Sequence, residues 1–184
     1  RDPRVFAFPK VKTEVFLDLE GTDPRLQEEG LAVCNYLIGT VWREDRGFIY
    51  QPFIAHSPDK EQDMLIEFCS FIDKLKDNCI IYHWHNYEKT NIRKMLEHYA
   101  FDSVTAEKVQ GKMVDLSPIA VKAYAFPTYG DGLKEIAKYI GYNWRQDDVN
   151  ALTSIVLYQK YVESQGTDKE SLDMILKYTE DDCL

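Results

Sequence analysis

The sequence predicts an α/β fold with a mixed central sheet, in which antiparallel strands are joined to parallel strands and helices flank the sheet. Three strand-like segments with short connections open the chain, which is typical of an antiparallel meander. Later, apolar residues at helical spacing alternate with short apolar runs, which is typical of parallel strands with crossover helices. The 184 residues, 45% of them hydrophobic, are enough for one core, so we expect a single domain over 1–184.

The first predicted strand runs from Glu14 to Gly21 and carries two acids, Asp18 and Glu20. Side chains alternate along a strand, so both acids lie on one face. Two acids in an apolar strand repel each other and are costly to desolvate, and a divalent cation with oxygen ligands would compensate them. A solvent-facing edge with a harmless pair of charges explains this stretch about equally well.

The next elements follow in a regular order. We expect strands at 34–42 and 48–53, joined by a hairpin loop at 43–47. A helix starts at 57–61, because Pro and acidic residues precede apolar side chains at helical spacing. Residues 78–83 are a compact apolar run suited to a buried parallel strand.

The second half of the chain is predicted to contain one more short strand, at 112–116, and helices that begin near residues 85, 130, 150 and 168. This order resembles the ribonuclease H-like arrangement, which implies that the first and fourth strands are neighbours. A parallel sheet places functional groups at its strand-to-helix junctions. Glu88, which follows the fourth strand, is therefore a candidate third acid beside Asp18 and Glu20.

The last predicted helix carries Tyr178 and Asp182, which share a face because they lie four residues apart. Together with Asp18, Glu20 and Glu88, Asp182 completes the type of site that binds two hard cations. Two cations about 4 Å apart can activate a water and stabilise the leaving oxygen of a phosphodiester. The phenol of Tyr178 could orient the attacking water or accept its proton.

Four pieces of the chain carry a family resemblance: residues 16–21, 82–88, 115–116 with 132–134, and the Tyr178-x-x-x-Asp182 motif. On these pieces the chain resembles the DEDD exonuclease superfamily of the ribonuclease H-like fold, in its tyrosine-bearing subgroup. More specifically, it resembles the YprB-type ribonuclease H-like domain of predicted RecB-family nucleases. The resemblance implies Mg²⁺- or Mn²⁺-dependent cleavage of DNA or RNA, usually from a 3′ end, with Asp18, Glu20, Glu88 and Asp182 as ligands of two ions.

The second motif departs from the family pattern. The superfamily usually has Asp after an aromatic residue, whereas this chain has Glu88 after Tyr87. Glu is one methylene longer and can reach a metal directly or through water. The third motif fits the tyrosine subgroup, because Lys177 stands where a histidine subgroup requires His.

The net charge limits the ways in which the chain could bind a nucleic acid. A formal charge of −9 argues against nucleic-acid binding through a broad basic surface. Affinity for single-stranded ends would then come from the metals, a local Lys/Arg cluster or another domain. We expect a domain excised from a longer protein and linked to other nuclease or helicase domains. A catalytically weak nucleic-acid-binding or scaffolding domain and a resolvase-like endonuclease are the rival hypotheses.

No apolar run approaches the length of a membrane span, and no signal peptide opens the chain, so we expect a cytoplasmic protein without membrane contact. The cysteines lack zinc-site spacing and are interpreted as reduced, mostly buried thiols.

Several other polar and aromatic residues have two interpretations each. A role at phosphate or metal competes with packing, capping or solvation for His83, His85, Asp115 and Lys134. Stacking on bases competes with ordinary packing for Tyr124, Phe126, Tyr129 and Trp144. A solvated acidic face is the interpretation of Asp147, Asp148, Glu180 and Asp181.

Overall fold

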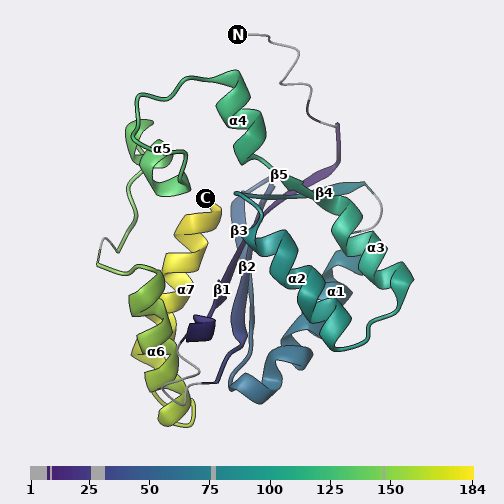
Figure 1. Cartoon of the computed structure of the whole chain (residues 1–184), viewed down its shortest axis with the longest axis vertical. Helices are drawn as coiled ribbons and strands as arrows, with labels where there is room; N and C mark the ends of the chain where they lie inside the picture. The colour runs from purple at the N-terminus through teal and green to yellow at the C-terminus, as the bar shows by residue number, and fades with distance from the viewer. Residues whose placement is uncertain (1–7, 9, 26–31, 76–77, 147) are drawn as a thin grey trace.

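A mixed sheet forms the centre of the molecule (Figure 1). The computed structural model describes residues 8, 10–25, 32–75, 78–146 and 148–184. Within these ranges the sheet has five strands in the order β3-β2-β1-β4-β5, and seven α-helices flank it. The predicted ribonuclease H-like mixed sheet is therefore confirmed. Asp147, placed on the predicted acidic face, lies outside the described residues.

Strand β1 (Thr13–Gly21) occupies the middle of the sheet. It pairs antiparallel with β2 (Asn35–Glu44), which in turn pairs antiparallel with the edge strand β3 (Gly47–Ile54). On its other side β1 pairs parallel with β4 (Cys79–His83), which pairs parallel with β5 (Met113–Asp115). The first and fourth strands are thus neighbours, as the element order predicts.

The helices follow the predicted order, with two additions, α3 (Ser103–Lys112) and α4 (Ser117–Ala123). A short 3-10 turn (Pro58–Lys60) leads into α1. The helix α3 follows α2 directly and was not predicted; a single buried residue, Val109, gives it little apolar periodicity. The side chain of Asp102 caps its N-terminus by accepting a hydrogen bond from the backbone N–H of Thr105. The α-helices are α1 (Glu61–Lys74), α2 (Tyr87–His98), α3 (Ser103–Lys112), α4 (Ser117–Ala123), α5 (Leu133–Tyr139), α6 (Ala151–Glu163) and α7 (Lys169–Cys183).

The two faces of the sheet have different coverings (Figure 1). On one face, Val15, Leu17 and Leu19 of β1 pack into the main hydrophobic core with residues of α1, α2 and α3. On the other face, α6 and α7 pack together and contact β1 and β2. Alternation along β1 directs Asp18 and Glu20 to this second face.

Gly39 on β2 lets α7 approach the sheet closely. It stands opposite Asp18 in the β1–β2 register. A Cβ atom at this position would lie 2.5 Å from Thr179 Cγ2 on α7, well inside the 3.5–4.0 Å at which carbon atoms pack. The absence of a side chain at position 39 therefore allows α7 to lie against the sheet at the level of Asp18.

Among the described helices, none combines the length and apolar content needed to cross a bilayer.

Candidate metal centre

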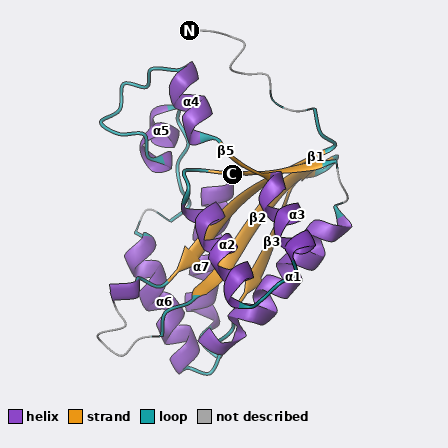
Figure 2. Cartoon of the chain, turned by 45° about the vertical axis from the view of Figure 1, so that its right-hand side comes forward, coloured by secondary structure: helices purple, strands orange, loops and turns teal. Residues whose placement is uncertain are grey.

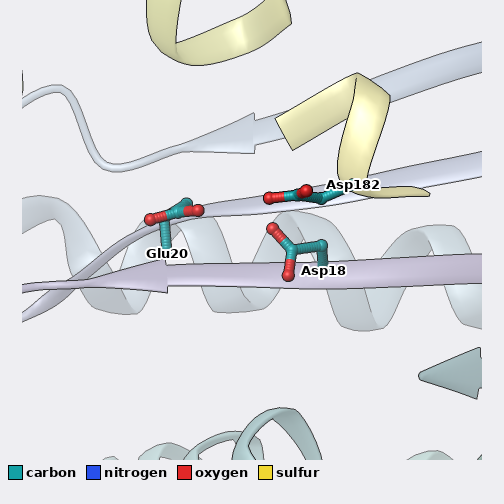
Figure 3. Close-up of side chains that lie close together, drawn as sticks. All are labelled: Asp18, Glu20 and Asp182. Atoms are coloured by element: carbon teal, nitrogen blue, oxygen red, sulfur yellow. The ribbon is translucent and has the colours of Figure 1, made fainter. Parts of the chain in front are cut away.

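Three carboxylates meet on the face of the sheet covered by α7. Asp18 and Glu20 come from β1, and Asp182 comes from the last turn of α7. One ligand oxygen from each lies within 4.8 Å of the others. Figure 3 shows the three carboxyl groups gathered around one space between the strand and the end of the helix. The structure thus brings together three of the four acids predicted to bind metal.

The surroundings make these carboxylates costly to ionise. Burial, followed by the charges of Glu20, Asp182 and Glu88, holds the pKa of Asp18 well above its ordinary value. Burial and the charge of Asp182 raise the pKa of Glu20 to about 7. Burial also raises the pKa of Asp182, although nearby Lys134 counteracts the shift.

The donor set suits a hard divalent cation. Asp18 Oδ2 is buried and has no hydrogen-bond partner among the described residues. Buried anionic oxygens without donors are unfavourable unless a positive charge compensates them. Carboxylate oxygens are the ligands that Mg²⁺ and Mn²⁺ prefer. The residues present therefore fit a hard divalent cation of the kind that the sequence predicts.

Glu88, the fourth predicted ligand, faces the same pocket from another element. It lies in the first turn of α2, is 7% exposed, and lines a pocket of about 500 Å³ together with Asp18 and Asp182. It does not belong to the group of oxygens within 4.8 Å. Its Oε2 lies 3.4 Å from Nδ1 of the buried His83. Coordination by Glu88 stays a prediction.

Tyr178 lies on α7 one turn before Asp182, with its hydroxyl held by a lysine. Lys134 Nζ donates a hydrogen bond to Tyr178 Oη at 2.8 Å and lies 4.1 Å from the centre of its ring. The same Nζ is 3.8 Å from Asp182 Oδ1. Burial, reinforced by Asp182 and Glu20, raises the pKa of the phenol. Both of its predicted roles, orienting a water and accepting its proton, stay predictions.

Lys134 and Trp144 are part of the site, although each had an ordinary interpretation from sequence. Lys134 lines the metal pocket and is not simply solvated. Trp144 is 7% exposed, and its Nε1–H donates to Asp182 Oδ1 at 2.6 Å. This bond fixes the carboxylate in place. Both residues are far from Asp182 in the sequence, so no short-range pattern predicts that they contact it.

The prediction of a solvated acidic face is wrong for Asp181. Its side chain is buried, and Oδ1 lies 2.7 Å from Arg145 Nε while Oδ2 accepts the backbone N–H of Arg145. Arg145 also pairs with Glu180 at 2.7 Å. The loop before α6 folds against α7 and supplies the positive charge. Asp115 lies one residue before Leu116, the N-cap of α4, and its Oδ1 accepts the backbone N–H of Ser117 at the start of that helix.

This architecture is similar to that of known proteins. The chain is similar to the solved structure of a family B DNA polymerase from the hyperthermophilic archaeon Pyrobaculum calidifontis, with a TM-score of 0.65 and 13% sequence identity. The match covers 95% of this chain and 24% of the polymerase chain, and at this identity it shows the fold alone. No curated protein matches the chain. The model of the RNase H superfamily matches residues 15–184, and the chain belongs to that superfamily.

Proposed function

We propose that this domain is a Mg²⁺- or Mn²⁺-dependent nuclease, acting as a 3′–5′ exonuclease on single-stranded ends. The observation that carries the proposal is the convergence of Asp18, Glu20 and Asp182 within 4.8 Å. Family membership supports a nucleic-acid substrate. The motif order described above supports the tyrosine-bearing DEDD subgroup and the YprB-type domain within it.

Each of the four acids would have a defined place in a two-metal site. Asp18, Glu20 and Asp182 would hold one ion between β1 and α7. Glu88, across the same pocket, would bind the second ion together with Asp18, directly or through water. Bound Mg²⁺ or Mn²⁺ supplies Lewis-acid stabilisation of the leaving oxygen and an activated water.

The neighbouring side chains would orient the reacting groups. The oxygen of Tyr178 accepts the hydrogen bond from Lys134, so its own O–H would be available to hold the water by a hydrogen bond. The ammonium of Lys134 lies 3.8 Å from Asp182, so it would be close to a phosphate held at the acids. Trp144 would keep the Asp182 carboxylate in its binding orientation.

Replacement of single carboxylates tests the proposal. Asp18→Asn and Asp182→Asn each remove one anionic ligand, and we expect cleavage of an end-labelled single strand with Mn²⁺ to fall by about a thousandfold or more. Asp173→Asn on the exposed face of α7 is the matched control, because that carboxylate pairs only with the surface Lys177 among the described ion pairs. Full activity in Asp18→Asn would refute the site.

The same assay separates the related activities. Strands labelled at the 5′ or the 3′ end report polarity, and DNA and RNA strands of equal sequence report the sugar preference. A closed circular single strand has no end, so its cleavage would identify a resolvase-like endonuclease instead.

A catalytically weak nucleic-acid-binding or scaffolding domain is the second candidate function. Two observations favour this second function. Glu88 lies apart from the three clustered acids, and Lys134 contacts Asp182. Both would weaken a second metal site. Calorimetric titration with Mn²⁺ discriminates: a nuclease binds two ions and loses binding in Asp18→Asn, whereas a scaffold shows no tight pair of sites.

A further inference from the structure

An apolar groove lies beside the metal centre, between α4 and α5. Its volume is about 630 Å³, within the range of small-molecule sites. Two of its residues, Trp84 and Leu116, also line the pocket of the three carboxylates, so the groove and that pocket are adjacent. Figure 2 shows α4 and α5 close together at one end of the sheet, near the C-terminal end of α7. The residues used in the argument are Trp84, Leu116, Tyr124, Phe126, Tyr139 and Ile140.

Aromatic rings form much of the groove and remain open to solvent. Tyr124 and Tyr139 are 56% and 58% exposed, and the rings of Tyr124 and Phe126 lie 5.7 Å apart. The indole N–H of Trp84 donates to the backbone oxygen of Asp131 at 2.9 Å, so the ring is fixed and its polar atom is already used. Such a surface recognises flat apolar faces rather than hydrogen-bonding edges.

The segment that builds the groove differs in charge from the rest of the chain. Residues 117–141 contain three lysines, Lys122, Lys134 and Lys138, against two acids, Asp131 and Glu135, whereas the whole chain has a formal charge of −9. The segment therefore has a formal charge of +1, so it opposes a polyanion less than the rest of this acidic chain does.

We propose that the groove between α4 and α5 binds, by stacking, the unpaired nucleobases next to the strand end held at the metal centre. This inference rests on the proposed nuclease function and extends it to the recognition of single strands. The adjacent pocket of acids and the net positive charge of residues 117–141 favour a nucleic-acid strand over a second copy of the chain or a peptide. Duplex bases are already stacked and paired, so entry would require unpairing, and the groove selects for single strands.

Binding without metal tests the groove separately from cleavage. Fluorescence anisotropy of a labelled oligothymidylate in EDTA at low salt measures affinity when no cleavage can occur. Tyr124→Ala and Tyr139→Ala should each raise the Kd about tenfold, which is the scale of one lost base stack. Tyr129→Ala, at a fully exposed tyrosine of the same connection, is the matched control and should leave the Kd unchanged. Thermal unfolding midpoints confirm that the variants are folded.

An abasic strand of equal length identifies the group that is recognised. It keeps the phosphates but lacks bases, so the two groove variants should bind it as well as the unsubstituted chain does. Unchanged Kd values for the oligothymidylate, equal losses for both strands, or equal losses in the Tyr129 control would overturn the proposal. A change from dimer to monomer in Tyr139→Ala, measured by light scattering, would assign the groove to a second copy. Absence of cleavage with intact stacking would overturn the nuclease function alone.

Discussion

Without metal, the domain should become less stable as pH rises, and Glu20 is the group for which this loss can be worked out. In the folded chain the pKa of Glu20 is about 7, against an ordinary value of 4.5. Below pH 4.5 the carboxyl is protonated in both the folded and the unfolded state. Between pH 4.5 and 7 the unfolded state releases the proton while the folded state keeps it. The free energy of unfolding therefore falls through this window.

The size of the effect follows from the shift. Each pKa unit corresponds to about 1.4 kcal/mol, so Glu20 removes about 3 kcal/mol of stability between pH 4.5 and a pH above 7. The variant Glu20→Gln cannot ionise, and its stability should fall correspondingly less over the same range. Glu67→Gln, on the exposed surface of α1, is the matched control and should keep the original slope.

Urea unfolding in EDTA at pH 5 and pH 8 measures the two slopes. Mn²⁺ added at pH 8, at a hundred times its Kd, should raise the free energy of unfolding by about 2.7 kcal/mol. The reason is that the ion binds the carboxylates of the folded state. The reasoning fails if the metal-free protein is equally stable at both pH values, or if Glu20→Gln and Glu67→Gln show the same slope.

Three further variants test the packing around the site. Gly39→Ala should cost about 1–3 kcal/mol in urea unfolding, because the methyl group would collide with α7, and should weaken Mn²⁺ binding by displacing the helix. Trp144→Phe removes the donor to Asp182 and should weaken Mn²⁺ binding about tenfold by calorimetry. Arg145→Met removes the guanidinium that pairs with the buried carboxylate of Asp181 and should cost about 2–3 kcal/mol in urea unfolding.

Each of these variants also has an outcome that would contradict its premise. Full stability of Gly39→Ala would mean that α7 does not need the close approach. Unchanged Mn²⁺ affinity in Trp144→Phe would show that the indole does not orient Asp182. A stable Arg145→Met would show that Asp181 is readily solvated, as the sequence predicted.

Local pattern was sufficient to predict most of the elements and the strand neighbours. Alternation along β1 separates Val15, Leu17 and Leu19 from Asp18, because a strand directs successive side chains to opposite faces. The order of strands and helices predicts that β1 and β4 are adjacent. The helix α3 escaped prediction because it buries only Val109, and helical periodicity is visible only where a face is apolar.

The sequence by itself determined which acids share a face of β1 and that Tyr178 and Asp182 share a face of α7, since both relations depend on backbone repeats of a few residues. Only the tertiary structure decided that Asp182 meets Asp18 and Glu20 while Glu88 lies farther away. It also decided that Lys134 and Trp144 contact the site. These contacts depend on how closely α7 and the 130–146 segment pack, and packing between distant segments leaves no periodic signal in a single sequence.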